Sequence, residues 1–179
     1  KSLDQQHFSA EGFEVIVVDD HSTDTTLKEV QAAQKQYPAL QLRVLQAPNP
    51  LDAGFVAYKK AAIRAGIRAA QGSWIVTTDA DCQPPSAWLS TLYRYIYRYQ
   101  PYLVSGPVCY SPQKGLFARL QALEFTALIS IGAASLRLNA PSMCNGANLA
   151  YKRSVFEAVR GFEGVDQIAS GDDELLMHK

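Results

Sequence analysis

Two short runs of apolar, mostly β-branched residues, each followed by a pair of carboxylates, constrain the fold of this chain most. One run, Val15–Val18, leads directly into Asp19 and Asp20, and a similar run leads to Asp79 and Asp81. Continuous apolar runs of this length are typical of strands buried inside a parallel sheet. Open α/β sheets bind ligands at the carboxyl ends of such strands. The two acid pairs are therefore predicted to lie on one rim of a sheet and to mark a ligand site.

The spacing of Asp79 and Asp81 also suits a metal. Carboxylates at positions i and i+2, where a strand turns, can share a hard divalent cation with phosphate oxygens and water. The motif alone is weak evidence, because the chain contains ten aspartates and chance predicts roughly half an Asp-x-Asp in a sequence of this length. Its weight comes from the second acid pair, Asp19 and Asp20.

Helical patterns separate the predicted strands. Three helices are expected, and Pro38, Gly72 and Pro101 end them in turn. A half-buried edge strand is expected near residues 40–44, and a Pro- and Gly-rich loop occupies Pro48–Ala57. The helices are expected at Thr25–Tyr37, Tyr58–Ala70 and Ala87–Gln100, the last with a buried stripe that includes Tyr93 and Tyr97. Alternating strands and helices predict an α/β fold with a parallel sheet.

The second half of the chain follows a different pattern. A broken strand, a long helix, a loop with a strand, and a short helix are expected there. The chain closes on Ser170–Leu176, where three acids lie on a loop that runs into a helix start. Acids in a first helical turn ordinarily cap the helix, but the loop position just before the helix can also aim a carboxylate at a substrate. These elements are expected at Leu103–Tyr110, Phe117–Leu136, Pro141–Tyr151 and Ser154–Val159, and Lys1–Phe8 is expected to be the tail of a helix.

Composition limits the class of protein. The chain has 179 residues, a mass of 19.7 kDa and zero net charge, with 17 basic and 17 acidic residues. That balance offers no global attraction to nucleic acid or to an anionic membrane. Its three widely spaced cysteines are typical of reduced thiols, and the apolar stretch Phe125–Leu136 falls short of the roughly 20 residues of a spanning helix. We therefore expect a single soluble, cytoplasmic domain.

Five motifs, in order along nearly the whole chain, resemble family 2 glycosyltransferases, the inverting enzymes with a GT-A fold. They are the segments Glu14–Asp24, Lys59–Ile63, Thr78–Cys82, Cys144–Arg153 and Ser170–Leu176. The resemblance implies a GT-A-type α/β domain, with a mostly parallel sheet flanked by helices, over residues 1–179. It also implies a nucleotide-sugar-binding half over residues 1–102 and an acceptor and catalytic-base half over residues 103–179.

The resemblance implies a role for each matched residue. Asp20, with Asp19 beside it, would hold the uracil or ribose end of a UDP-sugar, and Asp79 and Asp81 would bind Mn²⁺ or Mg²⁺ under the diphosphate. Lys59 or Lys60 would lie near the nucleotide. A segment at the donor–acceptor junction would comprise Asn145, Gly146 and Asn148, and the catalytic base would be Asp172, with Asp173 close behind.

The chemistry of sugar transfer needs these residue types. A diphosphate leaving group gains charge, which a divalent cation and a lysine can stabilise. Inverting transfer needs a further carboxylate, on the opposite side of the anomeric carbon, to accept the proton of the acceptor hydroxyl. The resemblance further implies a carbohydrate or lipid-linked acceptor, a bacterial polysaccharide setting and a membrane-attached parent protein at the cytoplasmic face of the inner membrane. Relatives continue beyond both ends of this segment, so we expect a fragment of a longer enzyme.

Other readings remain open. Asp19 and Asp20 could form an ordinary turn, Lys59 could be a surface residue, and His21 is better explained by a turn than by a metal. A phospho-receiver domain also gathers strand-end aspartates, although this chain has no Lys-Pro pair. A non-catalytic relative that binds a nucleotide or a carbohydrate is compatible with the sequence. A nucleotidyltransferase would have a Gly-rich basic loop near its start, which this sequence lacks.

Overall fold

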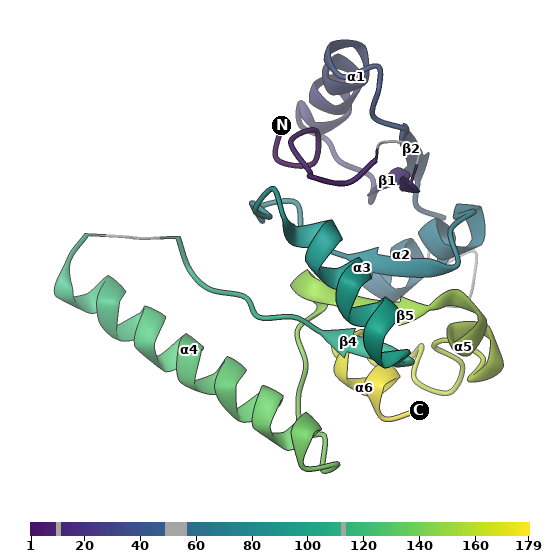
Figure 1. Ribbon diagram of the computed structural model, residues 1–179. Helices are drawn as coiled ribbons and strands as arrows, with labels where there is room; N and C mark the ends of the chain where they lie inside the picture. The colour runs from purple at the N-terminus through teal and green to yellow at the C-terminus, as the bar shows by residue number, and fades with distance from the viewer. Residues whose placement is uncertain (10–11, 49–56, 112–113) are drawn as a thin grey trace.

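The computed structural model describes residues 1–9, 12–48, 57–111 and 114–179, which form an α/β fold with a two-stranded and a three-stranded sheet (Figure 1). The loop predicted at Pro48–Ala57 falls mainly on residues 49–56, which lie outside the described residues.

The first sheet contains the strand that precedes the first acid pair. β1 (Val15–Asp19) pairs in parallel with β2 (Leu42–Gln46), with Val17 opposite Val44. α1 (Thr26–Gln36) connects the two strands, because parallel neighbours need a crossover connection of this kind. This part of the chain matches the expected strand–helix–strand order.

The next helix, α2 (Tyr58–Ala69), packs on β1 and has two lysines in its first turn. Gly66 allows the close approach, since a Cβ there would lie 3.2 Å from Cγ2 of Val18. Because Lys59 and Lys60 lie in the first turn of α2, they are at the positive end of the helix dipole. This turn contains no acid that would balance their charge. This local placement is unfavourable, and partners elsewhere in the fold must offset it.

The second sheet joins the two halves of the chain. β3 (Trp74–Thr77) and β4 (Leu103–Ser105) both run antiparallel to β5 (Leu149–Lys152), which lies between them. β3 and β4 are therefore parallel to each other, as the connection through α3 (Trp88–Tyr99) predicts. The predicted α/β fold is confirmed, but the described strands lie in two sheets: β1 and β2 are parallel, whereas β5 separates β3 from β4 and pairs antiparallel with both.

The hydrophobic core lies around β5. Leu149 and Tyr151 of this strand are buried against α2 and the C-terminal segment. Phe156 stacks on Tyr151 with ring centroids 5.9 Å apart and meets Phe162 edge-on at 5.3 Å. Burying side chains of this size contributes about 1.5–3 kcal/mol each. This core holds together the short elements η2 (Gly146–Asn148), α5 (Arg153–Ala158) and α6 (Glu174–Met177).

One helix stands apart from this body. α4 (Leu116–Arg137) has 22 residues and projects away from both sheets (Figure 1). Its most apolar 18-residue window has a mean hydropathy of 1.3 and is 6% buried. By length and composition alone it could cross a membrane, which corrects the prediction that this stretch is too short; one such helix does not establish a span. The exposed apolar side chains of α4 include Leu116, Phe117, Leu120, Leu123 and Ile131.

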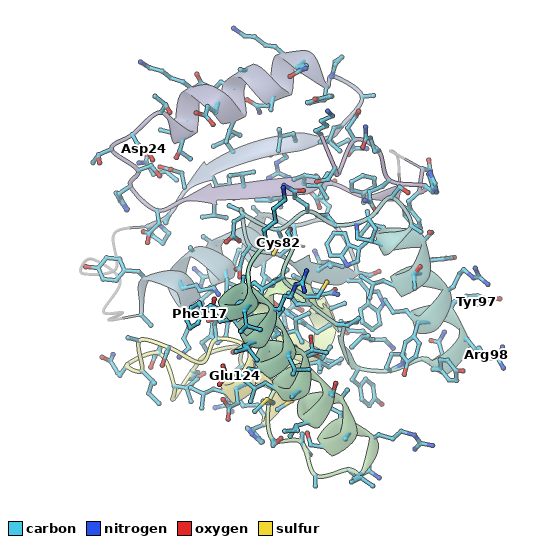
Figure 2. The ribbon with its side chains drawn as sticks, turned by 90° about the vertical axis from the view of Figure 1, so that its left-hand side faces the viewer. Asp24, Cys82, Tyr97, Arg98, Phe117 and Glu124 are labelled. Atoms are coloured by element: carbon cyan, nitrogen blue, oxygen red, sulfur yellow. The ribbon has the colours of Figure 1, made fainter. Side chains whose placement is uncertain are left out.

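Two local predictions were wrong. Residues 1–8 form turns instead of the end of a helix. Gln6 and His7 bind this segment to the start of α3 by hydrogen bonds, which include one from the amide of His7 to the carbonyl of Ser86. The Gln6 side chain donates to the carbonyl of Pro85 and accepts from the amide of Leu89. Tyr97 was expected in the buried stripe of α3, yet it is 72% exposed and projects from the edge of the molecule in Figure 2, and Tyr93 is 54% exposed.

Candidate active site

The acid pair after β3 forms an exposed turn. β3 ends at Thr77, and the amide of Cys82 donates to the carbonyl of Asp79 at 3.1 Å, which closes the turn. The carboxylates of Asp79 and Asp81 both remain accessible. The predicted acids therefore lie immediately beyond the end of a strand, where a ligand can reach them.

Lys59 brings this turn together with the distant C-terminal acids. Its Nζ lies 3.5 Å from Oδ1 of Asp79 and 3.4 Å from Oδ2 of Asp172. Asp79 is half-exposed, whereas the side chain of Asp172 is only 11% exposed. Burial by itself lowers the pKa of Lys59, but the carboxylates of Asp172 and Asp79 outweigh it and raise the pKa overall. Lys59 is therefore a cation shared by two of the predicted site acids.

Asp173 anchors the same loop to η2. Its Oδ2 accepts the amide of Gly146 at 2.7 Å, and its Oδ1 accepts the amide of Glu174 at 2.8 Å and caps α6. Both oxygens of Asp173 are thus occupied by backbone donors. Asp172 faces the same glycine, since a Cβ on Gly146 would lie 3.3 Å from Oδ2 of Asp172. Of the two acids, Asp172 has the carboxylate that is free of backbone bonds among the described contacts.

The residues around Gly146 connect β3, β4 and η2. The hydroxyl of Thr77 donates to the carbonyl of Gly146 at 2.6 Å, and the side chain of Asn145 accepts the amide of Ala147 and caps η2. Asn148 accepts from the indole of Trp88 and donates to the carbonyl of Pro107, each at 2.9 Å. Of the predicted junction residues, Gly146 contacts the acids directly, while Asn145 and Asn148 shape the backbone around it.

The acid pair after β1 is engaged with its own turn. Asp19 is 3% exposed; its Oδ2 accepts the amide of Ser22 at 3.3 Å, and its Oδ1 has no partner among the described residues. Asp20 is exposed and lies 3.3 Å from Nδ1 of His21, whose backbone is left-handed with φ of 60°. An unpartnered buried carboxylate oxygen is costly.

The predicted location of both pairs on one rim stays a prediction, because β1 and β3 are in different sheets.

Lys60 differs from its prediction. The side chain was expected near the nucleotide together with Lys59, yet it is fully buried. Its Nζ donates to the carbonyls of Val165, Ile168 and Ser170 at 3.0, 2.6 and 2.7 Å. An ammonium has three N–H bonds, so Lys60 has none left for a nucleotide. The hydrogen bonds of Lys60 hold the loop that precedes α6 instead.

Two side chains near these acids, the half-buried Cys144 and the buried Tyr151, are affected by the negative charge. Burial, with the carboxylates of Asp173, Glu174 and Asp172 adding to it, raises the pKa of the Cys144 thiol to about 12. Burial and then Asp172 also raise the pKa of the Tyr151 phenol. Both side chains are therefore neutral near pH 7 and serve as packing groups. All three cysteines are free, as the sequence predicts.

The carboxylates of the site are suitable ligands for a divalent cation, but they form only part of a coordination shell. Asp79 and Asp81 offer exposed, hard carboxylate oxygens, which are the ligands that Mn²⁺ and Mg²⁺ prefer. Within the described part of the chain, no three His, Cys, Asp or Glu side chains gather as a metal centre. Two carboxylates suit a cation that takes its remaining ligands from a phosphate-bearing substrate and water.

The fold is similar to that of two solved proteins with bound nucleotides. The structure is similar to S. aureus TarS residues 1–349 in complex with UDP, with a TM-score of 0.62, 20% identity, and coverage of 98% of this chain and 47% of that one. It is also similar to the mannosyltransferase PcManGT from Pyrobaculum calidifontis in complex with GDP-Man and Mn²⁺. There the TM-score is 0.66 and the identity 22%, with coverage of 93% and 44%. The chain thus has a GT-A-like α/β fold and spans less than half the length of either protein.

The family model described as Glycosyl transferase family 2 matches residues 1–160. This chain belongs to glycosyl transferase family 2. The matched range contains both strand-end acid pairs and the two lysines, and it ends before Asp172 and Asp173. The place of those two acids in the site therefore rests on their contacts with Lys59 and Gly146.

Sequence reasoning missed two contributors to this site. The sequence pattern indicates only that Thr77 belongs to a strand, but its hydroxyl also holds the carbonyl of Gly146, whose amide binds Asp173. The structural role of Lys60 was also missed, although one signal pointed to it. Of two lysines side by side in a first helical turn, only one can face the acid turn, because neighbouring residues on a helix point about 100° apart.

Proposed function

We propose that this chain carries the donor site and catalytic base of an enzyme that transfers a sugar from a nucleotide-diphosphate donor. The donor is a UDP-sugar, and the acceptor is a hydroxyl group of a carbohydrate or of a lipid-linked glycan. Membership of family 2 and the GT-A-like fold support sugar transfer in general. The complexes of TarS with UDP and of PcManGT with GDP-Man and Mn²⁺ support a nucleotide-linked donor.

One observation carries the assignment of residues. The ammonium of Lys59 lies within 3.5 Å of both Asp79 and Asp172, although these acids are 93 positions apart by their residue numbers, 172 − 79. One acid of the strand-end pair and a separate carboxylate therefore meet around one positive charge. Inverting transfer needs a phosphate-binding edge on one side of the anomeric carbon and a base on the other, and this arrangement of charges supports that proposal.

The residues have distinct roles in the proposed reaction. Asp79 and Asp81 would hold Mn²⁺ or Mg²⁺, which when bound supplies positive charge to the diphosphate. Lys59 contributes a further positive charge beside the leaving group. The acceptor oxygen forms a bond to the anomeric carbon while the bond from that carbon to the diphosphate oxygen breaks. Asp172 takes the acceptor proton, and the nucleoside diphosphate leaves with the electron pair.

Asp172 is the better base of the two adjacent acids. Asp173 already accepts two backbone N–H groups, so its position and both of its oxygens are committed to η2 and α6. Asp172 contacts Lys59 at the edge of the site and has no such backbone partner among the described contacts. The role of Asp173 in the proposed site is to hold the loop.

The donor site is tested by titration calorimetry of UDP into the chain, with and without Mn²⁺, for the unaltered protein and for Asp81→Ala. We expect Mn²⁺-dependent binding that Asp81→Ala removes. Asp173→Asn is a matched carboxylate control and should leave UDP binding intact. A well-folded chain that binds no UDP under either condition would contradict the proposal.

The base is tested by the release of UDP from UDP-sugars in the presence of oligosaccharide acceptors. Asp172→Asn is expected to lower turnover by about 10²–10⁴-fold, the usual contribution of a general base, without changing UDP affinity. UDP binding with no turnover in any variant would identify a non-catalytic nucleotide-binding relative instead. Turnover that survives Asp172→Asn would refute the assignment of the base.

A further inference from the structure

The buried ammonium of Lys60 organises the segment that leads to Asp172. Its three acceptors, the carbonyls of Val165, Ile168 and Ser170, all belong to one loop between α5 and α6. The last of them precedes Asp172 by two residues. The contact spans 110 positions of sequence, so it fixes this loop to the start of α2.

The geometry requires the charged form of the lysine. A neutral amine has two N–H bonds, whereas three carbonyl oxygens accept from Nζ at 2.6–3.0 Å. Burial lowers the pKa of Lys60, and the carboxylates of Asp172, Asp166 and Asp173 counteract part of that effect. A buried charge is retained only where its donors are satisfied, and here the loop backbone satisfies them.

The backbone between the lysine and the acid is also constrained. Gly171 has a left-handed φ of 73°, and its carbonyl accepts the amide of Leu175 at 3.1 Å. This turn sends the chain from the Ser170 carbonyl, held by Lys60, to Asp172, held by Lys59. The two neighbouring lysines therefore hold the backbone and the side chain of one short segment.

We propose that Lys60 is a positioning residue, which sets the location of the catalytic base Asp172 through the backbone of residues 165–171 and makes no contact with the donor. This inference rests on the proposed function, because it takes Asp172 as the base. It predicts that Lys60 affects the chemical step but leaves the binding of UDP unchanged, since Asp79 and Asp81 are held by β3 and its turn.

The test compares Lys60→Met with Arg68→Met, a matched loss of a cation at an exposed position of the same helix. For Lys60→Met we expect turnover to fall by about 10²-fold, the effect of a displacement near 1 Å, at unchanged UDP affinity with Mn²⁺. Lys60→Met combined with Asp172→Asn should be no slower than Asp172→Asn alone. A role that does not act through Asp172 would give losses that multiply. Reduced UDP affinity, multiplying losses or unchanged turnover would each overturn the inference.

Hydrogen exchange measured by mass spectrometry gives a readout that does not depend on turnover. Lys60→Met should raise exchange in peptides covering residues 165–177 and leave β5 unchanged. If Lys60→Met does not fold, Gly171→Ala displaces the same turn without touching the lysine and is expected to give the same pattern. If the unaltered chain shows neither UDP binding nor turnover, the proposed function fails, and the exchange pattern alone decides whether Lys60 holds the loop. Unchanged exchange over residues 165–177 would overturn the inference.

Discussion

Replacing Asp173 with alanine tests how the loop before α6 is held. The carboxylate accepts the amide of Gly146 at 2.7 Å and the amide of Glu174 at 2.8 Å. Losing a helix N-cap costs ~1 kcal/mol. The amide of the buried Gly146 would also be left without a partner, which costs ~1–3 kcal/mol. The free energy of unfolding is therefore expected to fall by about 2–4 kcal/mol.

Urea unfolding followed by the fluorescence of Trp74 and Trp88 measures this change. With a urea dependence of about 2 kcal/mol per molar, the midpoint for Asp173→Ala should fall by about 1–2 M. Glu174→Ala removes the neighbouring exposed charge but neither hydrogen bond, so its free energy of unfolding should change by less than about 0.5 kcal/mol. Asp173→Asn keeps one acceptor oxygen and should give an intermediate midpoint. An Asp173→Ala midpoint equal to that of the unaltered chain would refute this account of the loop.

Three further results are expected. Lys59→Met should change the free energy of unfolding by less than about 1 kcal/mol, because its ion pairs are partly exposed. It should nevertheless slow the release of UDP from a UDP-sugar by about tenfold or more, and an unchanged rate of UDP release would contradict its role. Gly106→Ala would make a Cβ clash with the side chain of Asn148 and break its bond to Trp88, so we expect the free energy of unfolding to fall by about 1–3 kcal/mol and tryptophan fluorescence to change in urea titrations. Burial and nearby carboxylates raise the pKa of Cys144 from 9.0 to about 12, so the unfolded thiol ionises first and stability falls as the pH rises from 9 to 12. Cys144→Ala should reduce that loss in urea titrations at increasing pH, and a loss of the same size in both proteins would contradict it.

Local sequence patterns determined the elements and the candidate acids. β1 and β3 each match an apolar run, and α1, α2 and α3 end within one or two residues of the predicted boundaries. These boundaries can be predicted because the periodicity of apolar residues and the breaks caused by Pro and Gly are local signals that extend over only a few residues. The resemblance then assigned Asp79, Asp81 and Asp172 to one site, and two of these three meet at Lys59.

Long-range packing decided the rest. No local signal places β5 antiparallel between β3 and β4, because strand order depends on which edges the chain can reach once the helices have packed. Local sequence also does not determine which of the two adjacent lysines, Lys59 or Lys60, faces the acids. The turn of the helix points Lys59 at carboxylates and Lys60 at backbone carbonyls more than 100 residues away in sequence. The sequence alone thus determined which side chains could do the chemistry. The tertiary structure decided which of them face the site, because that depends on the direction of each side chain after the elements have packed.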